Sequence, residues 1–159
     1  MDILEITSPA FEDNGMMPLK YTGLAEELSP PLDIKGVSDK AQSLALIADD
    51  PDAPMITVTH WVIWNIPPEM TSIPENIPSG PVIDALKGAS QGINIARKHA
   101  YIGPRPPSGT HRYRFKIYAL DTKLELKQRS GKKQLEKAME GHILQQGMLT
   151  GLFNRKQVD

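Results

Sequence analysis

The chain has 159 residues, no cysteine and a formal net charge of −1, with basic and acidic side chains in nearly equal numbers. The lack of cysteine excludes disulfides, thiolate catalysis and cysteine-ligated zinc. The balanced charge argues against a nucleic-acid partner or a polybasic membrane anchor. A chain of this length can bury a core without cross-links, so we expect a single domain over residues 1–159.

Membrane insertion and secretion are not expected either. Residues 1–5 are acidic and contain no apolar run of the kind found in signal peptides. The longest stretch without a charged residue, 53–68, includes His60 and Asn65 and falls short of the ~20 apolar residues that a spanning helix needs. We therefore expect a cytoplasmic protein.

The first two thirds of the chain show strand-like segments separated by prolines. Short strands are expected at residues 3–7 and 32–36. Segments 43–49 and 58–66 are apolar at both alternate positions, which is typical of interior strands covered on two faces. Segment 67–81 holds five prolines and little periodicity, so we expect a long surface connection. A short strand at 92–95 is predicted to follow it.

The last third contains the clearest alternation and the one good helix signal. Residues 112–120 alternate between apolar and polar side chains, which predicts a strand with one solvated face. Residues 147–153 are predicted to form a final strand. A helix with Ser130 as its N-cap is predicted from apolar positions at helical spacing, namely Leu135, Ala138, Met139, His142 and Ile143. These elements together predict a mainly β protein, an antiparallel β-sandwich with one or two short helices.

Three polar residues continue the alternation of apolar strand faces. They are Asp50 after Leu44, Leu46 and Ala48; His60 on the face of Val58, Val62, Trp64 and Ile66; and His111 before Tyr113, Phe115 and Ile117. A buried charge or imidazole is costly without partners. We therefore expect Asp50, His60, His111 and Tyr113 to share one polar pocket, with Asp50 as the partner of His60.

The sequences around these residues resemble a known family. The strings DPDAP at 50–54, HWV at 60–62 followed by WNIP at 64–67, and GPRPPSGTHRY at 103–113 are similar to those of the phosphatidylethanolamine-binding protein family, in its bacterial and archaeal Raf-kinase-inhibitor-like branch. The resemblance extends over most of the chain, from residues 11–13 to 147–151. It implies a large central sheet with a smaller sheet and a helix packed on it.

The resemblance also implies a ligand site. Asp50, His60, His111 and Tyr113 match the family's pocket residues, and Gly103, Pro106 and Pro107 match one wall of its anion pocket. The residue types alone leave other interpretations open. Asp50 could belong to an ordinary turn, His60 could be a satisfied core residue, and the 103–109 loop could be a rigid connection.

The expected function is the binding of a small anion, phosphate or a phosphomonoester headgroup, without cofactor or metal. The family link implies a regulator or inhibitor of kinases or proteases, and the sequence leaves a homodimer open. The alternative is a metal-dependent or acid–base hydrolase that uses Asp50, His60 and His111. A third hypothesis is an interaction protein with a vestigial pocket. Nucleic-acid binding is not expected, because the aromatic and basic residues of 112–116 lie on opposite strand faces.

Overall fold

The computed structural model describes residues 3–157, so the first two residues of the acidic start and the last two residues of the chain lie outside it. Strands make up most of the fold. The elements in chain order are β1 (Glu5–Thr7), β2 (Gly15–Met16), η1 (Leu19–Tyr21), β3 (Leu32–Lys35), β4 (Ser43–Asp50), β5 (Val58–Ile66), β6 (Ser72–Ile73), β7 (Val82–Ile83), η2 (Asp84–Leu86), β8 (Ala89–Gln91), β9 (Thr110–Leu120), α1 (Lys132–Met139), β10 (Ile143–Asn154) and η3 (Arg155–Gln157). The mainly β class predicted from the sequence is confirmed.

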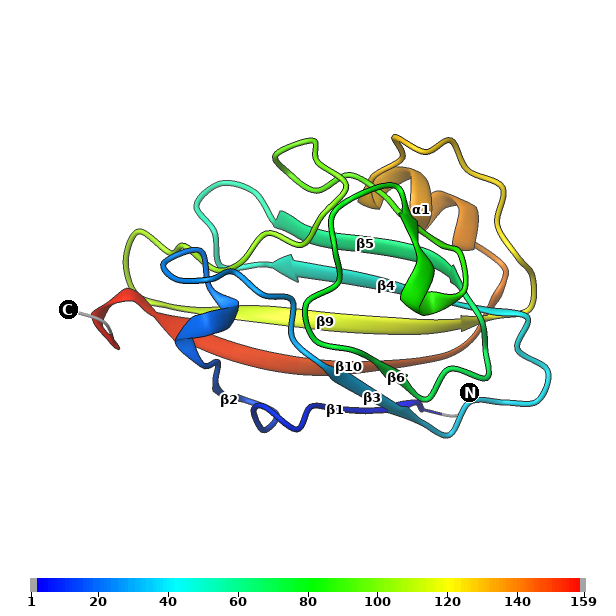
Figure 1. Cartoon of the computed structure of the whole chain (residues 1–159), viewed down its shortest axis with the longest axis horizontal. Coiled ribbons are helices and arrows are strands. Elements are labelled where there is room, and N and C mark those ends of the chain that lie inside the picture. The colour runs from blue at the N-terminus through cyan, green and yellow to red at the C-terminus, as the bar shows by residue number, and fades with distance from the viewer. Residues whose placement is uncertain (1–2, 158–159) are drawn as a thin grey trace.

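The strands form a large and a small sheet (Figure 1). The large sheet has seven strands in the order β2-β10-β9-β4-β5-β8-β7, and the small sheet has three in the order β1-β3-β6. Among the described strands, every pairing is antiparallel except that of β2 with β10. This is the antiparallel sandwich with a large central sheet that we expected.

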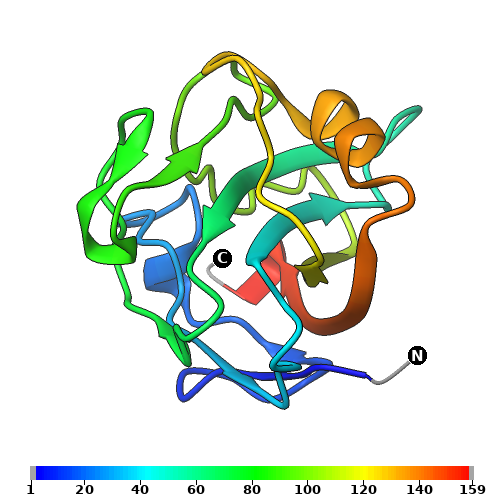
Figure 2. The same ribbon diagram turned by 90° about the vertical axis from the view of Figure 1, so that its right-hand side faces the viewer.

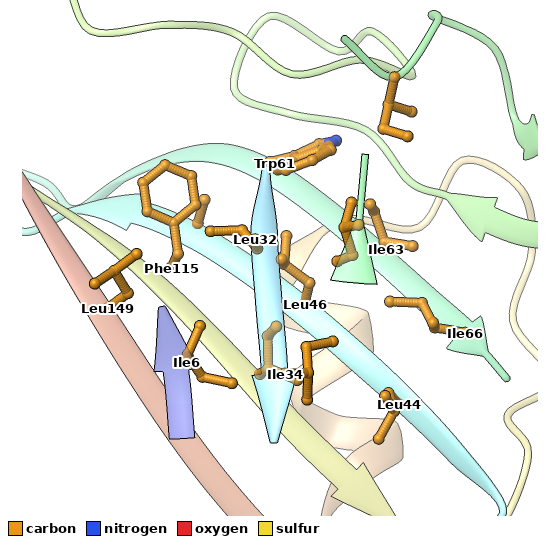
Figure 3. Close-up of a cluster of buried hydrophobic side chains, with 14 of the residues drawn as sticks. Ile6, Leu32, Ile34, Leu44, Leu46, Trp61, Ile63, Ile66, Phe115 and Leu149 are labelled. Atoms are coloured by element: carbon orange, nitrogen blue, oxygen red, sulfur yellow. The ribbon is translucent and has the colours of Figure 1, made fainter. Parts of the chain in front are cut away.

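The main hydrophobic core lies between the two sheets. Figure 3 shows Leu32 and Ile34 of the small sheet beside Leu46 and Trp61 of the large one, and each of these side chains is at most 1% exposed. Full burial of one such side chain contributes roughly 1.5–3 kcal/mol to folding. A second cluster lies on the other side of the large sheet and includes Leu135 and Met139 of α1. Figure 2 shows α1 beside this side of the sheet. β4 and β5 are therefore covered on both faces, as their composition predicted.

Helix α1 is shorter than the apolar spacing predicted. Its N-cap is Gly131 rather than Ser130, and the Gln134 side chain accepts a hydrogen bond from the Gly131 amide at 3.0 Å. The helix ends before Gly141, whose positive φ of 78° is typical of a residue that terminates a helix. His142 therefore lies outside the helix, and the next residue already begins β10.

The segment between β5 and β9 also differs from the prediction. The short strand lies at Ala89–Gln91 rather than at 92–95. It ends where Gly92 passes so close to another segment that a Cβ there would lie 2.3 Å from the Ser130 carbonyl oxygen. The 67–81 connection contains the two-residue strand β6, which pairs with β3. β2 and β7, with two residues each, were not predicted.

Two bulges in β5 decide which of its side chains face the main core. Ala48 pairs with Trp61 but Asp49 pairs with Thr59, so His60 is an extra residue. A second register shift follows near Asn65, whose φ is +57°. Such shifts move side chains to the opposite face. As a result, Trp61, Ile63 and Ile66 lie between the sheets, whereas Val62 and Trp64 lie beneath α1. The predicted shared face of His60 with Val62 and Trp64 is therefore wrong.

In residues 3–157 there is no helix whose length and apolar character would let it cross a membrane.

Candidate functional site

Three strand ends and one loop meet at one end of the large sheet (Figure 1). β4 ends there at Asp50, β5 begins at Val58, and β9 begins at Thr110 after the 103–109 loop. Together they enclose a cavity of about 270 Å³. Its walls include all of the predicted site residues, namely Asp50, His60, Gly103, Pro106, Pro107, His111 and Tyr113. The remaining walls are formed by Ala53, Pro54, Val58, Ile95, Ile102 and Arg105.

Asp50 and His111 form a buried pair in this cavity. The Asp50 Oδ2 atom lies 2.6 Å from His111 Nδ1, and the two side chains are 5% and 8% exposed. The other ring nitrogen of His111 lies 3.1 Å from the Ser108 carbonyl oxygen. The remaining Asp50 oxygen accepts the amide hydrogen of Asp52 at 2.8 Å, in an Asx turn. Our prediction that Asp50 pairs with His60 is thus wrong.

His60 has a different partner because its ring is turned toward the neighbouring loop. Its Nδ1 atom lies 2.6 Å from the Ile102 carbonyl oxygen, to which it donates a hydrogen bond in the neutral ring. Burial lowers the pKa of His60 from 6.5, although the Ile102 carbonyl and the nearby Asp50 carboxylate act in the opposite direction. The imidazole is therefore neutral at pH 7, and its Nε2 atom is a hydrogen-bond acceptor.

Tyr113 packs edge-on against His60, with ring centroids 5.3 Å apart. Burial, followed by the negative charge of Asp50, raises the pKa of the Tyr113 hydroxyl above 10, so the phenol stays protonated. Within residues 3–157, neither this hydroxyl nor His60 Nε2 has a hydrogen-bond partner, and no fully buried side-chain nitrogen or oxygen lacks one. Both atoms are therefore accessible, and both residues line the cavity.

The 103–109 loop, which forms one wall of the cavity, is held in place by the loop that contains Gly23 and Glu27. No sequence motif indicated this second loop. The Glu27 carboxylate accepts hydrogen bonds from the Gly103 amide and from Arg105 Nη2, each at 3.1 Å. The Gly23 amide donates to the Pro104 carbonyl at 2.9 Å. No pattern in the sequence could link Glu27 with Arg105, because the two residues are 78 positions apart.

These contacts change the interpretation of Gly103. A Cβ atom on Gly103 would lie 2.5 Å from the Tyr21 carbonyl oxygen, so the close approach of the neighbouring loop requires glycine at this position. The Gly103 amide already bonds Glu27, and prolines have no amide hydrogen to offer. The wall therefore shapes the cavity, while its Gly103 amide and its prolines offer the cavity no free amide donor.

The cavity does not assemble a cluster of metal ligands. In the described part of the chain, no three His, Asp or Glu side chains converge closely enough to hold a metal ion. Asp50, His60 and His111 as placed here therefore do not form the metal site that the metal-dependent hydrolase alternative requires.

The comparison with protein families agrees with the three motifs. The family model described as "Phosphatidylethanolamine-binding protein" matches residues 7–154. The chain belongs to this family. The resemblance expected from the motifs is therefore confirmed.

Archaeal relatives cover nearly the whole chain. A UPF0098 protein of Pyrococcus horikoshii is 51% identical over 151 residues, which cover 94% of this chain and 76% of that protein. A UPF0098 protein of Methanothermobacter thermautotrophicus is 48% identical over 153 residues, covering 96% of this chain and 99% of the relative. Their names state the grouping and no activity.

Two solved family structures share the fold. CT736 of Chlamydia trachomatis, described as a homolog of phosphatidylethanolamine-binding proteins, superposes with a TM-score of 0.87 at 34% identity, covering 98% of this chain and 99% of that one. Escherichia coli YbcL, described as a member of the mammalian family, gives a TM-score of 0.86 at 26% identity, covering 96% and 99%. The two-sheet architecture of this chain is thus that of its family.

Proposed function

We propose that the cavity binds a small oxyanion, either inorganic phosphate or a phosphomonoester headgroup. The observation that carries this proposal is the pair of free polar atoms on its wall, the Tyr113 hydroxyl and His60 Nε2. A singly protonated phosphate matches both, since its oxygens accept from the phenol and its P–OH group donates to the imidazole. The Arg105 guanidinium on the wall adds positive charge.

Asp50 pairs with His111 and His60 with the Ile102 carbonyl, so no carboxylate partner favours a protonated His60 as the donor to the anion. Instead, burial keeps His60 neutral, and His111 directs both of its ring nitrogens to protein oxygens. In the proposed complex, neutral hydrogen bonds orient the anion and Arg105 supplies the attraction.

The test is isothermal titration calorimetry with inorganic phosphate at pH 7. A hydrogen bond to a charged group is worth about 1.5–3 kcal/mol, so Tyr113→Phe should weaken phosphate binding by roughly tenfold or more. Tyr118→Phe is the matched control, because Tyr118 lies on the same strand but packs against the cluster beneath α1. Unchanged affinity in Tyr113→Phe would refute the proposed site, and no binding by the wild type would favour a vestigial pocket.

The finer roles expected from the resemblance stay predictions. Inhibition of kinases or proteases needs a target, and no side chain of the cavity specifies one. The homodimer and the cytoplasmic location are likewise untested expectations. No particular contact favours a hydrolase, because Asp50 and His111 bond each other and the Ser108 group that faces His111 is its backbone carbonyl. We therefore do not propose an enzymatic activity.

A further inference from the structure

The outer face of the large sheet, opposite the main core, carries a row of basic residues beside a row of largely apolar ones. On β9 the basic side chains alternate with residues that point into the main core. In the β9–β10 pairing Arg112 lies opposite Leu152, Arg114 opposite Thr150, and Lys116 opposite Met148; Met16 of β2 lies beside Leu152.

The basic row is organised around one buried carboxylate. Asp49 has a side chain that is 0% exposed, and its oxygens accept hydrogen bonds from Arg114 Nε at 2.8 Å, Lys116 Nζ at 2.8 Å and Lys132 Nζ at 3.0 Å. Burial raises the pKa of Asp49, but the hydrogen bonds from Arg114 and Lys116 outweigh it, so the pKa is lowered and the group is ionised. One negative charge thus meets three positive ones.

The excess positive charge is reachable from solvent. The two lysine Nζ atoms bond the same Asp49 oxygen, so they are no more than about 6 Å apart and repel each other. Among residues 3–157, none of the three cations pairs with a second carboxylate. The side chains of Arg114, Lys116 and Lys132 are 28%, 16% and 21% exposed. A further negative charge placed here would therefore be stabilised.

Exposed apolar side chains adjoin these cations. Met148 is 51% exposed directly opposite Lys116, and Met16 is 45% exposed beside the half-buried Leu152. Helix α1 covers the outer side of β4 and β5 (Figure 2). Its Leu135 and Met139 side chains pack there in the second hydrophobic cluster. Methionine adapts its shape to a partner surface, which suits it to protein recognition.

We propose that this basic–methionine face, made of Arg114, Lys116, Lys132, Met148, Met16 and Leu152, binds an acidic amphipathic segment of another protein. Acidic side chains would complete the charge around Asp49, and apolar side chains of the same segment would cover the methionines. A symmetric contact with a second copy is disfavoured, because it would bring two positive clusters together. Nucleic acid is disfavoured because Tyr113 and Phe115 of β9 lie in the main core and Tyr118 packs against the cluster beneath α1, so β9 offers no row of free aromatic rings for stacking. The proposal does not depend on the cavity.

The test uses a synthetic amphipathic peptide of glutamate and leucine, with a lysine–leucine peptide of the same pattern as the charge-reversed control. Fluorescence anisotropy at low salt measures affinity, and amide NMR shifts of the full chain locate the contact. We expect Lys132→Gln and Met148→Ser each to weaken binding about fivefold, in the range of single interface contacts. The matched controls are Lys133→Gln, the exposed neighbour of Lys132, and Met55→Ser on the exposed 51–57 loop, and both should bind as the wild type does.

Lys132→Gln leaves Asp49 two of its cationic partners, and thermal melts establish that each variant is folded. Amide shifts confined to β9, β10 and the start of α1 would support the proposal. Equal loss in Lys132→Gln and Lys133→Gln, shifts confined to the cavity loops, or equal binding of the lysine–leucine peptide would overturn it. So would tighter binding to phosphatidylserine vesicles than to the acidic peptide, or self-association lost in Met148→Ser.

Discussion

Asp49 and Asp50 are consecutive residues whose carboxylates lie on opposite faces of the large sheet. Asp49 bonds Arg114, Lys116 and Lys132 on the outer face, whereas Asp50 bonds His111 in the cavity. The alternation of a strand produces this arrangement without any special backbone geometry. The last two residues of β4 thereby anchor two separate charged groups, and a buried carboxylate is tolerated on each side because it has partners.

The Asp50–His111 pair predicts which histidine matters more for folding. His111→Ala leaves the buried Asp50 Oδ2 atom without its partner, and breaking such a buried pair costs on the order of 3 kcal/mol. The hydrogen bond that His60→Ala removes is the one to the Ile102 carbonyl, which leaves no carboxylate unpaired and costs about 1–2 kcal/mol. Urea unfolding of both variants measures the difference.

The pairing expected from the sequence, with His60 as the partner of Asp50, would give the opposite order. A larger loss in His60→Ala than in His111→Ala would contradict the pairing seen here. The double variant Asp50→Asn/His111→Ala is the control, since it should recover part of the stability that His111→Ala loses.

The lowered pKa of His60 predicts a pH dependence of stability. The unfolded imidazole titrates near 6.5 and the folded one below that value, so the unfolded state binds more protons in between. The stability contributed by neutral His60 is present above pH 6.5 and is lost as the pH falls toward the folded pKa. Urea unfolding between pH 5 and 7.5 should show a smaller decrease for His60→Gln than for the wild type.

The Asp52 carboxylate also has a shifted pKa, but it titrates below the range of pH 5 to 7.5. The hydrogen bonds from Arg112 lower the pKa of Asp52 to about 2, so this carboxylate loses its contribution only below pH 4. Parallel curves for the wild type and His60→Gln would show that a different group controls stability between pH 5 and 7.5.

Gly103→Ala should disturb the cavity wall although alanine is small. The added Cβ would lie 2.5 Å from the Tyr21 carbonyl oxygen and 2.9 Å from the Gly23 nitrogen, so one loop must move. Overpacking of this kind costs about 1–3 kcal/mol. Thermal melts would measure the loss, and a melting temperature equal to that of the wild type would mean that the two loops are not in close contact.

Glu27→Gln tests how the second loop affects the proposed anion site. The change removes a negative charge close to the wall and frees Arg105, while glutamine can still accept from the Gly103 amide. We expect phosphate affinity to rise about two- to fivefold, with less than about 1 kcal/mol change in stability, because the Arg105 side chain is 55% exposed and solvent screens its ion pair with the half-buried Glu27. Glu26→Gln, an exposed neighbour, is the matched control.

Calorimetry with phosphate measures this effect. Lower affinity in Glu27→Gln would show that the Glu27 charge supports the site through loop position instead of opposing the anion. Equal effects of Glu26→Gln and Glu27→Gln would show that only the overall charge of the loop matters.

The sequence alone determined the fold class and the members of the candidate site. Alternating and doubly apolar segments predicted β3, β4, β5 and β9 within a few residues, because side-chain burial follows the local period of a strand. The prolines predicted the main connections, because a proline has no amide hydrogen to donate within a sheet. This reason is local as well. The three motifs predicted that Asp50, His60, His111 and Tyr113 share one pocket, and all four residues line the cavity.

Only the tertiary structure decided how those residues interact. The bulge at His60 turned Val62 and Trp64 to the helix side, and a bulge depends on the register with β4, which local periodicity does not encode. His111 pairs with Asp50, and the Gly103 amide donates a hydrogen bond to Glu27. Both contacts join residues that are more than 60 positions apart in the sequence. Partner choice at such separations depends on distances and angles that exist only once the sheets have packed.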